Sequence, residues 1–333
     1  MLYSLFNTVA ALYLGALIIY ILWVRLHWSR PWWLQAFSTI SPWAFAPTLA
    51  LPALAVLMRS PLFCLLSIAA ASIFAYQFLR PMFPHHEIAR RVEPAHLKAM
   101  TANLLKINTR QVGKIIGAII AESPDVVALQ ELKAEHAQAI DTLLADAYPH
   151  RLLSPGKDSE GMGLLSRYPF LDSAEHIVAP GANPTQTARI EINGRSVWLV
   201  NSHPRIPDLH LCHQAGVRYP CGLSTTKRRA DVEGIIQLAQ RLGGDAILLG
   251  DFNLTDQCEE YGLLTAQWAD AYRVAGKGPG LTYPVGRPFF GLHSPFPLFR
   301  IDYLFYPPTW RPLRAHTGAM PGSDHRYLVV ELA

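Results

Sequence analysis

The first 84 residues constrain the fold of this chain more than any other feature, because they contain no acidic residue and very few basic ones. Their formal charges are four arginines, at Arg25, Arg30, Arg59 and Arg80. These arginines separate three apolar runs, 1–24, 31–58 and 60–79, each near or above the about 20 residues that a helix needs to cross the hydrocarbon core. We therefore predict a membrane anchor over 1–80, with three transmembrane helices at 5–24, 43–58 and 60–79.

The second run is the least regular, because Pro42, Pro47 and Pro52 fall within it. A proline inside a helix removes a backbone hydrogen bond and crowds the preceding turn. A re-entrant hairpin therefore remains the alternative for this run. The first run lacks the basic start and small-residue cleavage site of a signal peptide, so we expect it to stay attached.

The charge of the remaining chain is balanced. The chain has 29 basic and 25 acidic residues, and all but the four anchor arginines lie from position 85 onward, which leaves 25 of each sign. A domain that binds nucleic acid through its overall charge would carry a basic excess of its own. Composition therefore gives no support to nucleic-acid binding, and the four cysteines are too few for a disulfide scaffold.

Two signals disagree about the side of the membrane that carries the carboxyl-terminal domain. The arginines of the first loop and those that follow the third run place the domain in the cytoplasm by the positive-inside rule. Cys212 and Cys221, close together in a polar loop, instead suit a disulfide in an oxidising compartment. Two free thiols, or a metal cluster with His210 and His213, are the alternatives for this pair. We expect an integral, multi-pass protein, in the inner membrane if bacterial, with the domain on the extracytoplasmic side.

A polar, proline-containing stretch at 81–95 is typical of a linker, and an α/β pattern follows it. Spacing of apolar residues predicts helices at 112–120, 133–147 and 226–242. Short apolar runs predict strands at 97–103, 125–131, 163–166, 188–192, 197–202, 246–250, 301–306 and 327–332. Because strands outnumber the helices that alternate with them, we predict a layered α/β domain over 96–333.

Polar residues stand where these strands end or begin, and they define the candidate active site. They are Asn103, Glu131, His203, Asp251 with Asn253, Asp302, and the run Ser323-Asp324-His325. The set supplies carboxylates, amides and imidazoles, and the sequence contains no nucleophile elbow or Gly-rich phosphate loop. This inventory favours hydrolysis at a phosphate by a water that a hard cation and a base position.

The order and wording of these motifs resemble the endonuclease/exonuclease/phosphatase superfamily. The motifs are TANLL, ALQEL, GMGLLSR, VNSHP, LLGDFN, RIDYLF and GSDHR, and they cover about residues 96–333. Members of that superfamily include deoxyribonucleases, abasic-site endonucleases, inositol polyphosphate 5-phosphatases and neutral sphingomyelinases. The resemblance implies a deoxyribonuclease-like four-layer α/β/β/α sandwich, here preceded by an anchor like that of a membrane-bound bacterial branch.

The resemblance also implies a role for each site residue. Glu131, Asn103 and Asp324 would hold Mg²⁺ or Mn²⁺. Asp251 would activate the attacking water, and Asn253 would hold that water or donate to a phosphate oxygen. His203 and His325 would act on the phosphate, with Asp302 orienting His325.

Other basic residues give weaker indications. Arg167 and Arg189 are candidates for substrate binding, although an arginine beside a strand is more often a surface ion-pair partner. Lys227-Arg228-Arg229 is interpreted as the solvated face of a helix, with a nucleic-acid patch as the alternative.

The expected function is that of a membrane-anchored, divalent-metal-dependent phosphodiesterase or endonuclease. A sphingomyelinase-like lipid or inositol phosphate hydrolase and a catalytically silent membrane scaffold remain alternatives. The expected partners are a phosphoester substrate, either nucleic acid or a phospholipid or inositol phosphate, and the lipid bilayer through residues 1–80. The sequence indicates no obligate protein partner.

Overall fold

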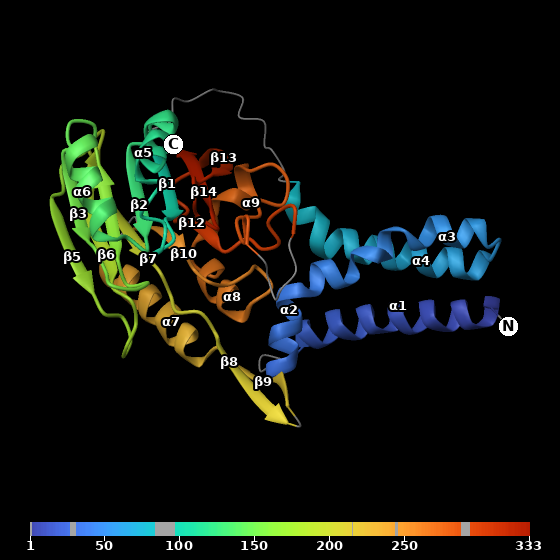
Figure 1. Cartoon of the computed structure of the whole chain (residues 1–333). Helices are drawn as coiled ribbons and strands as arrows, with labels where there is room; N and C mark the ends of the chain where they lie inside the picture. The colour runs from blue at the N-terminus through green and yellow to red at the C-terminus, as the bar shows by residue number, and fades with distance from the viewer. Residues whose placement is uncertain (1, 27–30, 84–96, 215, 244–245, 288–293) are drawn as a thin grey trace. The chain divides into compact units, whose positions relative to one another are not determined.

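The computed structural model describes residues 2–26, 31–83, 97–214, 216–243, 246–287 and 294–333 (Figure 1). The chain divides into two compact units. One unit contains the described part of Met1–Phe83 with Leu209–Leu223 and Gln257–Glu259, and the other contains the remainder. Most of the predicted linker 81–95 lies outside the described residues.

The first unit contains a group of apolar helices. Tyr13 and Tyr20 of the first helix donate hydrogen bonds to the Ala44 carbonyl and the Ser41 hydroxyl of the second, at 2.6 and 3.0 Å. These bonds satisfy the polar ends of tyrosines that otherwise pack against apolar side chains. The helical elements are α1 (Leu2–Leu26), α2 (Trp32–Phe45), η1 (Ala46–Leu49), α3 (Leu51–Leu57), α4 (Pro61–Phe74), η2 (Ala75–Leu79) and η3 (Arg80–Met82).

The prolines of the second apolar run are accommodated mainly at element starts. Pro47 and Pro52 lie in the first two positions of η1 and α3, where a backbone N–H has no intrahelical acceptor. Pro42 alone lies inside a helix, α2. The run is therefore broken into two helices joined by a 3₁₀ turn rather than forming one regular helix over 43–58.

Among the described residues, two helical segments, against the three expected, are long and apolar enough to cross a membrane. They are Trp32–Leu57, with 26 residues, and Phe63–Met82, with 20. In the first run the described apolar segment is Ala10–Val24, which lies within the 25-residue helix α1. Length and composition thus support two candidate spans.

A two-stranded hairpin, β8 (Asp208–Gln214) and β9 (Val217–Ser224), carries the cysteine pair. Cys212 and Cys221 form a disulfide, with Cα atoms 5.6 Å apart. The structure therefore has neither the free-thiol nor the metal-cluster arrangement at this pair. Among the described residues, Cys64 and Cys258 are free thiols.

The second unit contains two six-stranded mixed sheets. The first sheet has the order β13-β14-β1-β2-β4-β3, and the second has β11-β12-β10-β7-β6-β5. Parallel neighbours, β1 with β2 and β7 with β10, lie at the centre of each sheet, and the other pairs are antiparallel. The strands of the first sheet are β1 (Leu97–Asn103), β2 (Val126–Gln130), β3 (His150–Ser154), β4 (Met162–Ser166), β13 (Pro312–Ala319) and β14 (Arg326–Leu332); those of the second are β5 (Asp172–His176), β6 (Thr185–Ile192), β7 (Arg195–Ser202), β10 (Ala246–Asp251), β11 (Ala269–Asp270) and β12 (Asp302–Tyr306).

The two sheets pack face to face around one core, and helices flank them (Figure 1). Leu97 and Ala99 of β1 pack in the core between the two sheets. Met100 and Ala102, on the opposite face of β1, pack against α5 and α6. Because successive side chains point to opposite faces of a strand, a central strand of this fold carries apolar side chains on both faces. An α/β fold with two flanked sheets agrees with the expected layers. The helices of this unit are α5 (Val112–Glu122), α6 (Ala134–Leu143), α7 (Thr226–Arg241), α8 (Glu259–Thr265) and α9 (Ala271–Ala275).

Candidate active site

The candidate residues converge on one edge of the two-sheet sandwich. Parallel strands deliver their carboxyl ends to the same edge of a sheet, and β12 and β14, antiparallel to their neighbours, deliver their amino ends there. Asn103 ends β1, Asp251 ends β10 and Asp302 begins β12, while Glu131, His203 and His325 lie one residue outside β2, β7 and β14.

Asp251 lies at the centre of this group and is 1% exposed. Its Oδ2 accepts a 3.0 Å hydrogen bond from Nδ2 of Asn103, which comes from the other sheet. The Nε2 atoms of His203 and His325 lie 3.6 and 3.7 Å from the same oxygen. Its Oδ1 accepts a 2.9 Å bond from the Asn253 backbone N–H. A buried carboxylate with these partners is held in one orientation.

Gly250 permits this arrangement. Its φ of 152° belongs to a region that favours glycine. A Cβ at this position would lie 1.9 Å from the backbone oxygen of Ser202 on β7. The missing side chain therefore lets β7 and β10 approach closely where His203 and Asp251 follow.

His325 is held from three directions. Its Nδ1 lies 3.0 Å from Oδ2 of Asp302, its backbone N–H donates to the Ser323 hydroxyl at 3.0 Å, and the Tyr283 ring lies 4.8 Å from its own ring. Burial lowers the pKa of His325, but the carboxylates of Asp302 and Asp251 outweigh burial and raise it to about 10. Without a cation nearby, His325 is thus an imidazolium at neutral pH.

His203 is oriented by its backbone surroundings. Its Nδ1 donates to the Ser159 carbonyl at 3.1 Å, which fixes the tautomer and turns Nε2 toward Asp251. Nδ2 of Asn183 donates to the His203 carbonyl at 2.9 Å. Two imidazoles therefore flank one carboxylate.

Glu131 and Asn103 form the side of the site that suits a cation. Glu131 has a φ of 56°, and its two carboxylate oxygens accept from Nδ2 of Asn103 at 3.3 Å and the Lys106 backbone N–H at 2.8 Å. The Asn103 Nδ2 thus lies between the carboxylates of Glu131 and Asp251, while its Oδ1 accepts the Leu105 backbone N–H at 2.9 Å. Carboxylate and amide oxygens are the ligands that Mg²⁺ prefers.

Asp324 and Asp302 add carboxylate oxygens. The Arg287 guanidinium lies 3.8 Å from Oδ2 of Asp324, and burial raises the pKa of this carboxyl. Oδ1 of Asp302 is buried without a hydrogen-bond partner among the described residues. Ligand atoms of Asp251, Asp302 and His325 lie within 4.8 Å of one another. Because His325 uses Nδ1 to bind Asp302, the oxygen-rich side at Glu131 fits a hard cation better.

Arg167 and Arg189 are not brought to this edge. Arg167 bonds Asp125 and Ser123 at 3.3 and 2.6 Å, at the amino end of β2, whereas Glu131 follows its carboxyl end. Arg189 lies opposite Trp198 in the β6–β7 register, with its guanidinium over the indole ring. Both are engaged in local contacts remote from Asp251 along their strands.

Arg228 is the main functional candidate that the sequence did not indicate. It is buried, and its guanidinium donates to the Asn253 carbonyl at 2.6 Å and to Glu260 at 3.1–3.2 Å. Asn253 has a φ of 52°, and its Nδ2 donates to the Pro204 carbonyl at 2.9 Å. Lys227-Arg228-Arg229 is therefore not a uniformly solvated helix face.

Comparisons with known proteins agree with this fold. The model of the Endonuclease/Exonuclease/phosphatase family matches residues 100–325. An endonuclease/exonuclease/phosphatase from Bacteroides vulgatus is 20% identical, with a TM-score of 0.55, covering 71% of this chain and 98% of its own. D. rerio TDP2 complexed with a single-strand DNA product is 19% identical, with a TM-score of 0.54 and coverages of 71% and 98%. No curated protein sequence matches the chain.

The pKa of His325 predicts how stability depends on pH once metal is removed. The folded-state value of about 10 exceeds the unaltered 6.5, so the folded state binds this proton more tightly than the unfolded state. The stabilisation is complete below pH about 6.5 and is lost as the pH rises toward 10. Thermal unfolding of the full chain in detergent with EDTA should show this decline, and His325→Gln should reduce it. Equal declines in both proteins would contradict the assignment.

Proposed function

Because the chain belongs to the endonuclease/exonuclease/phosphatase family, we propose that it is a divalent-metal-dependent phosphodiesterase or endonuclease that uses Asp251 to activate water. The observation that carries this proposal is the buried Asp251 carboxylate between two imidazoles, next to an oxygen-rich edge at Glu131. A general base of this kind is effective when it is fixed within hydrogen-bond reach of a water.

In this mechanism Asp251 accepts the proton of the attacking water, while the Asn253 N–H on Oδ1 and the Asn103 amide on Oδ2 hold the carboxylate in place. His325, as an imidazolium, donates through Nε2 to an oxygen of the phosphate as negative charge develops there. His203 donates through Nε2 in its doubly protonated form, because its Nδ1–H is bonded to the Ser159 carbonyl. Asp302 keeps the His325 ring in place through Nδ1. Asn253 acts on Asp251 through its backbone N–H. Its side-chain NH₂ is bonded to the Pro204 carbonyl, so the amide oxygen is the side-chain atom that can hold the water.

The proposed metal ligands are Glu131, Asn103 and Asp324, with Mg²⁺ or Mn²⁺ as the ion. Asn103 would ligate through Oδ1, which accepts the Leu105 backbone N–H without the ion. When bound, the ion would neutralise charge on the phosphate and orient it. Lys106, whose backbone N–H bonds Glu131, keeps that carboxylate turned toward Asn103. Asn103 then joins the proposed metal side of the site to Asp251.

Two substrate classes remain open under this proposal. A single-strand DNA product bound to D. rerio TDP2, which shares the fold, favours a nucleic-acid phosphodiester. The two candidate membrane spans favour a phospholipid or inositol phosphate at the bilayer. We place the nucleic-acid phosphodiester first. The family match that supports it covers the catalytic fold and does not depend on the membrane anchor.

The proposal predicts that Asp251→Asn and His325→Ala each lower metal-dependent hydrolysis by about 10²–10⁴-fold, because each removes a proton-transfer or charge-stabilising group. The full chain, purified in detergent, is assayed against single- and double-stranded DNA, RNA, sphingomyelin, phosphatidylinositol phosphates and bis-p-nitrophenyl phosphate, with Mg²⁺, Mn²⁺ or EDTA. Asp146→Asn, an exposed aspartate on the loop after α6, is the control.

The substrate that is cleaved decides between the nucleic-acid and lipid readings. Unchanged turnover in both site variants would refute the mechanism. A folded chain that binds Mg²⁺ but hydrolyses none of these substrates would favour the silent-scaffold alternative.

We further infer that Arg228 positions Asp251 through the Asn253 backbone. Replacing Arg228 and Glu260 together by Met removes the bond to the Asn253 carbonyl but leaves no unpaired buried charge. The expected result is a loss of kcat of about 10²-fold with unchanged KM and a melting temperature near that of the parent. The control is Arg229→Met with Glu233→Met, an exposed ion pair on the same helix.

Loss of kcat in the buried-pair variant, with the exposed-pair variant unaffected, supports positioning. A double variant that melts far below the parent would assign the pair a structural role. Parental kcat in the buried-pair variant would remove Arg228 from the mechanism.

We propose that the apolar helices anchor the protein in a membrane as a multi-pass segment, with the catalytic domain on an oxidising side. The Cys212–Cys221 disulfide supports that side, because cytosolic thiols are usually reduced. In a Cys64→Ser, Cys258→Ser background, maleimide should label the denatured chain from intact cells only after reduction. Cys221→Ser, which frees Cys212, is the labelled control. Labelling of both cysteines without reductant would place the domain in the cytoplasm.

A further inference from the structure

Residues 282–287 are bound to the active-site edge by hydrogen bonds on two sides. The Thr282 hydroxyl accepts from the backbone N–H of Asp302 at 3.4 Å, and the Thr282 carbonyl accepts from the Arg326 N–H at 2.8 Å. Three residues further on, the Val285 N–H donates to the Asp324 carbonyl at 2.8 Å. The segment is therefore fixed to the starts of β12 and β14, where site residues lie.

Within this segment, Tyr283 packs against the site itself. Its ring centroid lies 4.8 Å from that of His325. Burial and the nearby carboxylates of Asp324 and Asp251 raise the pKa of Tyr283, so its hydroxyl stays protonated. The chain passes from this half-buried ring to exposed backbone at Gly286, so the residue that follows lies at the rim of the same site.

That residue is Arg287. Its Nε lies 3.8 Å from Oδ2 of Asp324, and its side chain is 43% exposed, against 6% for His325 and 1% for Asp251. A separation of 3.8 Å is longer than a hydrogen bond, and Arg287 forms no hydrogen bond with the described residues. The N–H donors of its guanidinium are therefore open to a ligand.

Two other basic side chains near this edge are already engaged. The Lys106 ammonium binds Asp158 on the loop between β3 and β4, and the buried Arg228 guanidinium binds Glu260 at 3.1 Å. Arg287 thus differs from both in having an exposed charge and unused hydrogen-bond donors at the mouth of the site.

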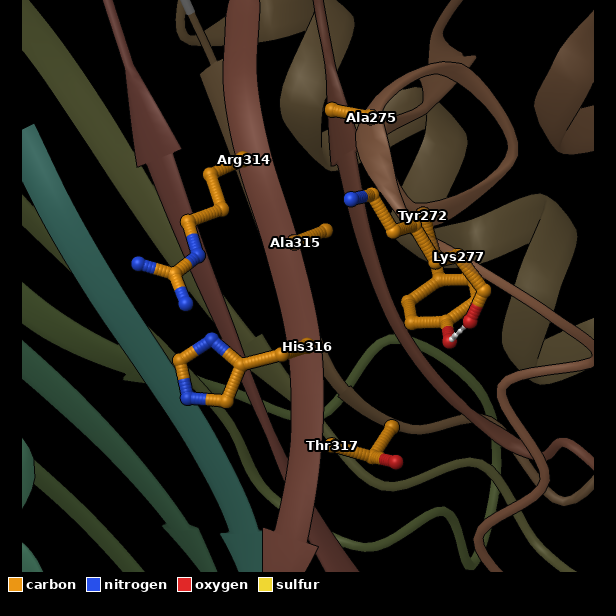
Figure 2. A pocket seen from close by; sticks show the side chains of 7 residues that line it. All are labelled: Tyr272, Ala275, Lys277, Arg314, Ala315, His316 and Thr317. Carbon is orange, nitrogen blue, oxygen red and sulfur yellow. Dashed lines mark hydrogen bonds between the residues drawn. The ribbon is translucent and has the colours of Figure 1, made fainter.

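The cations around a cavity at β13 do not offer a comparable arrangement. This cavity has a volume of about 280 Å³ and lies between α9 and β13. Figure 2 shows Arg314 on one side of β13, and Lys277 with the Tyr272 ring on the other. Because these two cations lie on opposite sides of the strand, they do not converge on one ligand.

Given the proposed function, in which His203 and His325 hold the reacting phosphate, we propose that Arg287 binds a second phosphate group of the same substrate. Its contact is Asp324 at the rim rather than Asp251 at the floor, so it reaches a group that lies outside the reacting centre. A guanidinium matches a phosphate through two parallel hydrogen bonds.

Charge narrows the substrate further. Under the proposed function Asp324 ligates the ion, so its charge no longer balances that of Arg287. A phosphate next to the reacting one occurs in a nucleic-acid strand and in a phosphorylated inositol head group. The choline of sphingomyelin is cationic, so Arg287 would repel it. Substrates with a flanking phosphate are therefore favoured over phosphodiesters in general.

Calorimetry in an Asp251→Asn background tests this subsite, because intact substrates can then be bound with Mg²⁺ present. The full chain in maltoside detergent is titrated with thymidylyl-thymidine carrying a 3′-phosphate, a 5′-phosphate or neither, and with glycerophosphoinositol with or without a 4-phosphate. One phosphorylated probe should bind at least about tenfold more tightly than its unphosphorylated counterpart, because hydrogen bonds between charged groups are strong. The ratio of kcat/KM for the same probes, measured with Asp251 intact, is the second measure.

The test variant is Arg287→Gln, in which the ratio of the two affinities should fall to about one. Arg287→Lys should retain part of the preference, because it keeps the charge without the planar fork. The matched control is Arg241→Gln, which should retain the full preference. Arg241 is exposed in the last turn of α7, before β10 begins, whereas Asp251 ends β10.

The probe family in which the added phosphate strengthens binding identifies the source of the second phosphate, either a nucleic-acid strand or an inositol phosphate. An unchanged ratio in Arg287→Gln, or no preference with Arg287 intact, would overturn the proposal and leave the proposed function standing. A folded chain that binds none of the probes would contradict the proposed function itself, and this subsite with it.

Discussion

The candidate site depends on one buried carboxylate. Asp251 is 1% exposed, and a charge so far from water is stable only when other groups replace its hydration. The Asn103 amide, the Asn253 backbone N–H and two imidazoles supply that replacement. Each of these groups needs support of its own, which Asp302, Ser159 and Arg228 provide. Much of the buried polar structure at this edge therefore follows from the burial of a single charge.

The same requirement explains why two sheets meet here. Asn103 belongs to the first sheet and Asp251 to the second, so the bond between them exists only when the sheets are packed in register. A second hydrogen bond joins the two sheets, from Gln130 Nε2 on β2 to Asn201 Oδ1 on β7, at 2.8 Å. Buried polar pairs of this kind disfavour any shifted packing, because a shift would leave them unsatisfied. The core thus fixes the relative position of residues that are far apart in the sequence.

The sequence predicted the central strands and the residues at their ends, because a strand buried on both faces is a continuous apolar run and a polar residue at its end is conspicuous. The strands β3, β5 and β13 were missed, because edge strands are half exposed and carry polar residues that mask the pattern. Arg228 was taken for a solvated residue, since its partners Asn253, on the loop after β10, and Glu260, in α8, are distant in the sequence. Among the described residues, two segments are long and apolar enough to span a membrane, against the three predicted.

The balanced charge of residues 85–333 limits how this domain can recognise a phosphoester. With 25 basic and 25 acidic residues, its net field gives a polyanion little long-range attraction. Several arginines are further neutralised by carboxylates, as Arg228 is by Glu260 and Arg205 by Asp231. Recognition must therefore come from individual groups placed at short range. The imidazoles of His203 and His325 beside Asp251 are such groups, since the Ser159 carbonyl and the Asp302 carboxylate hold their rings in place.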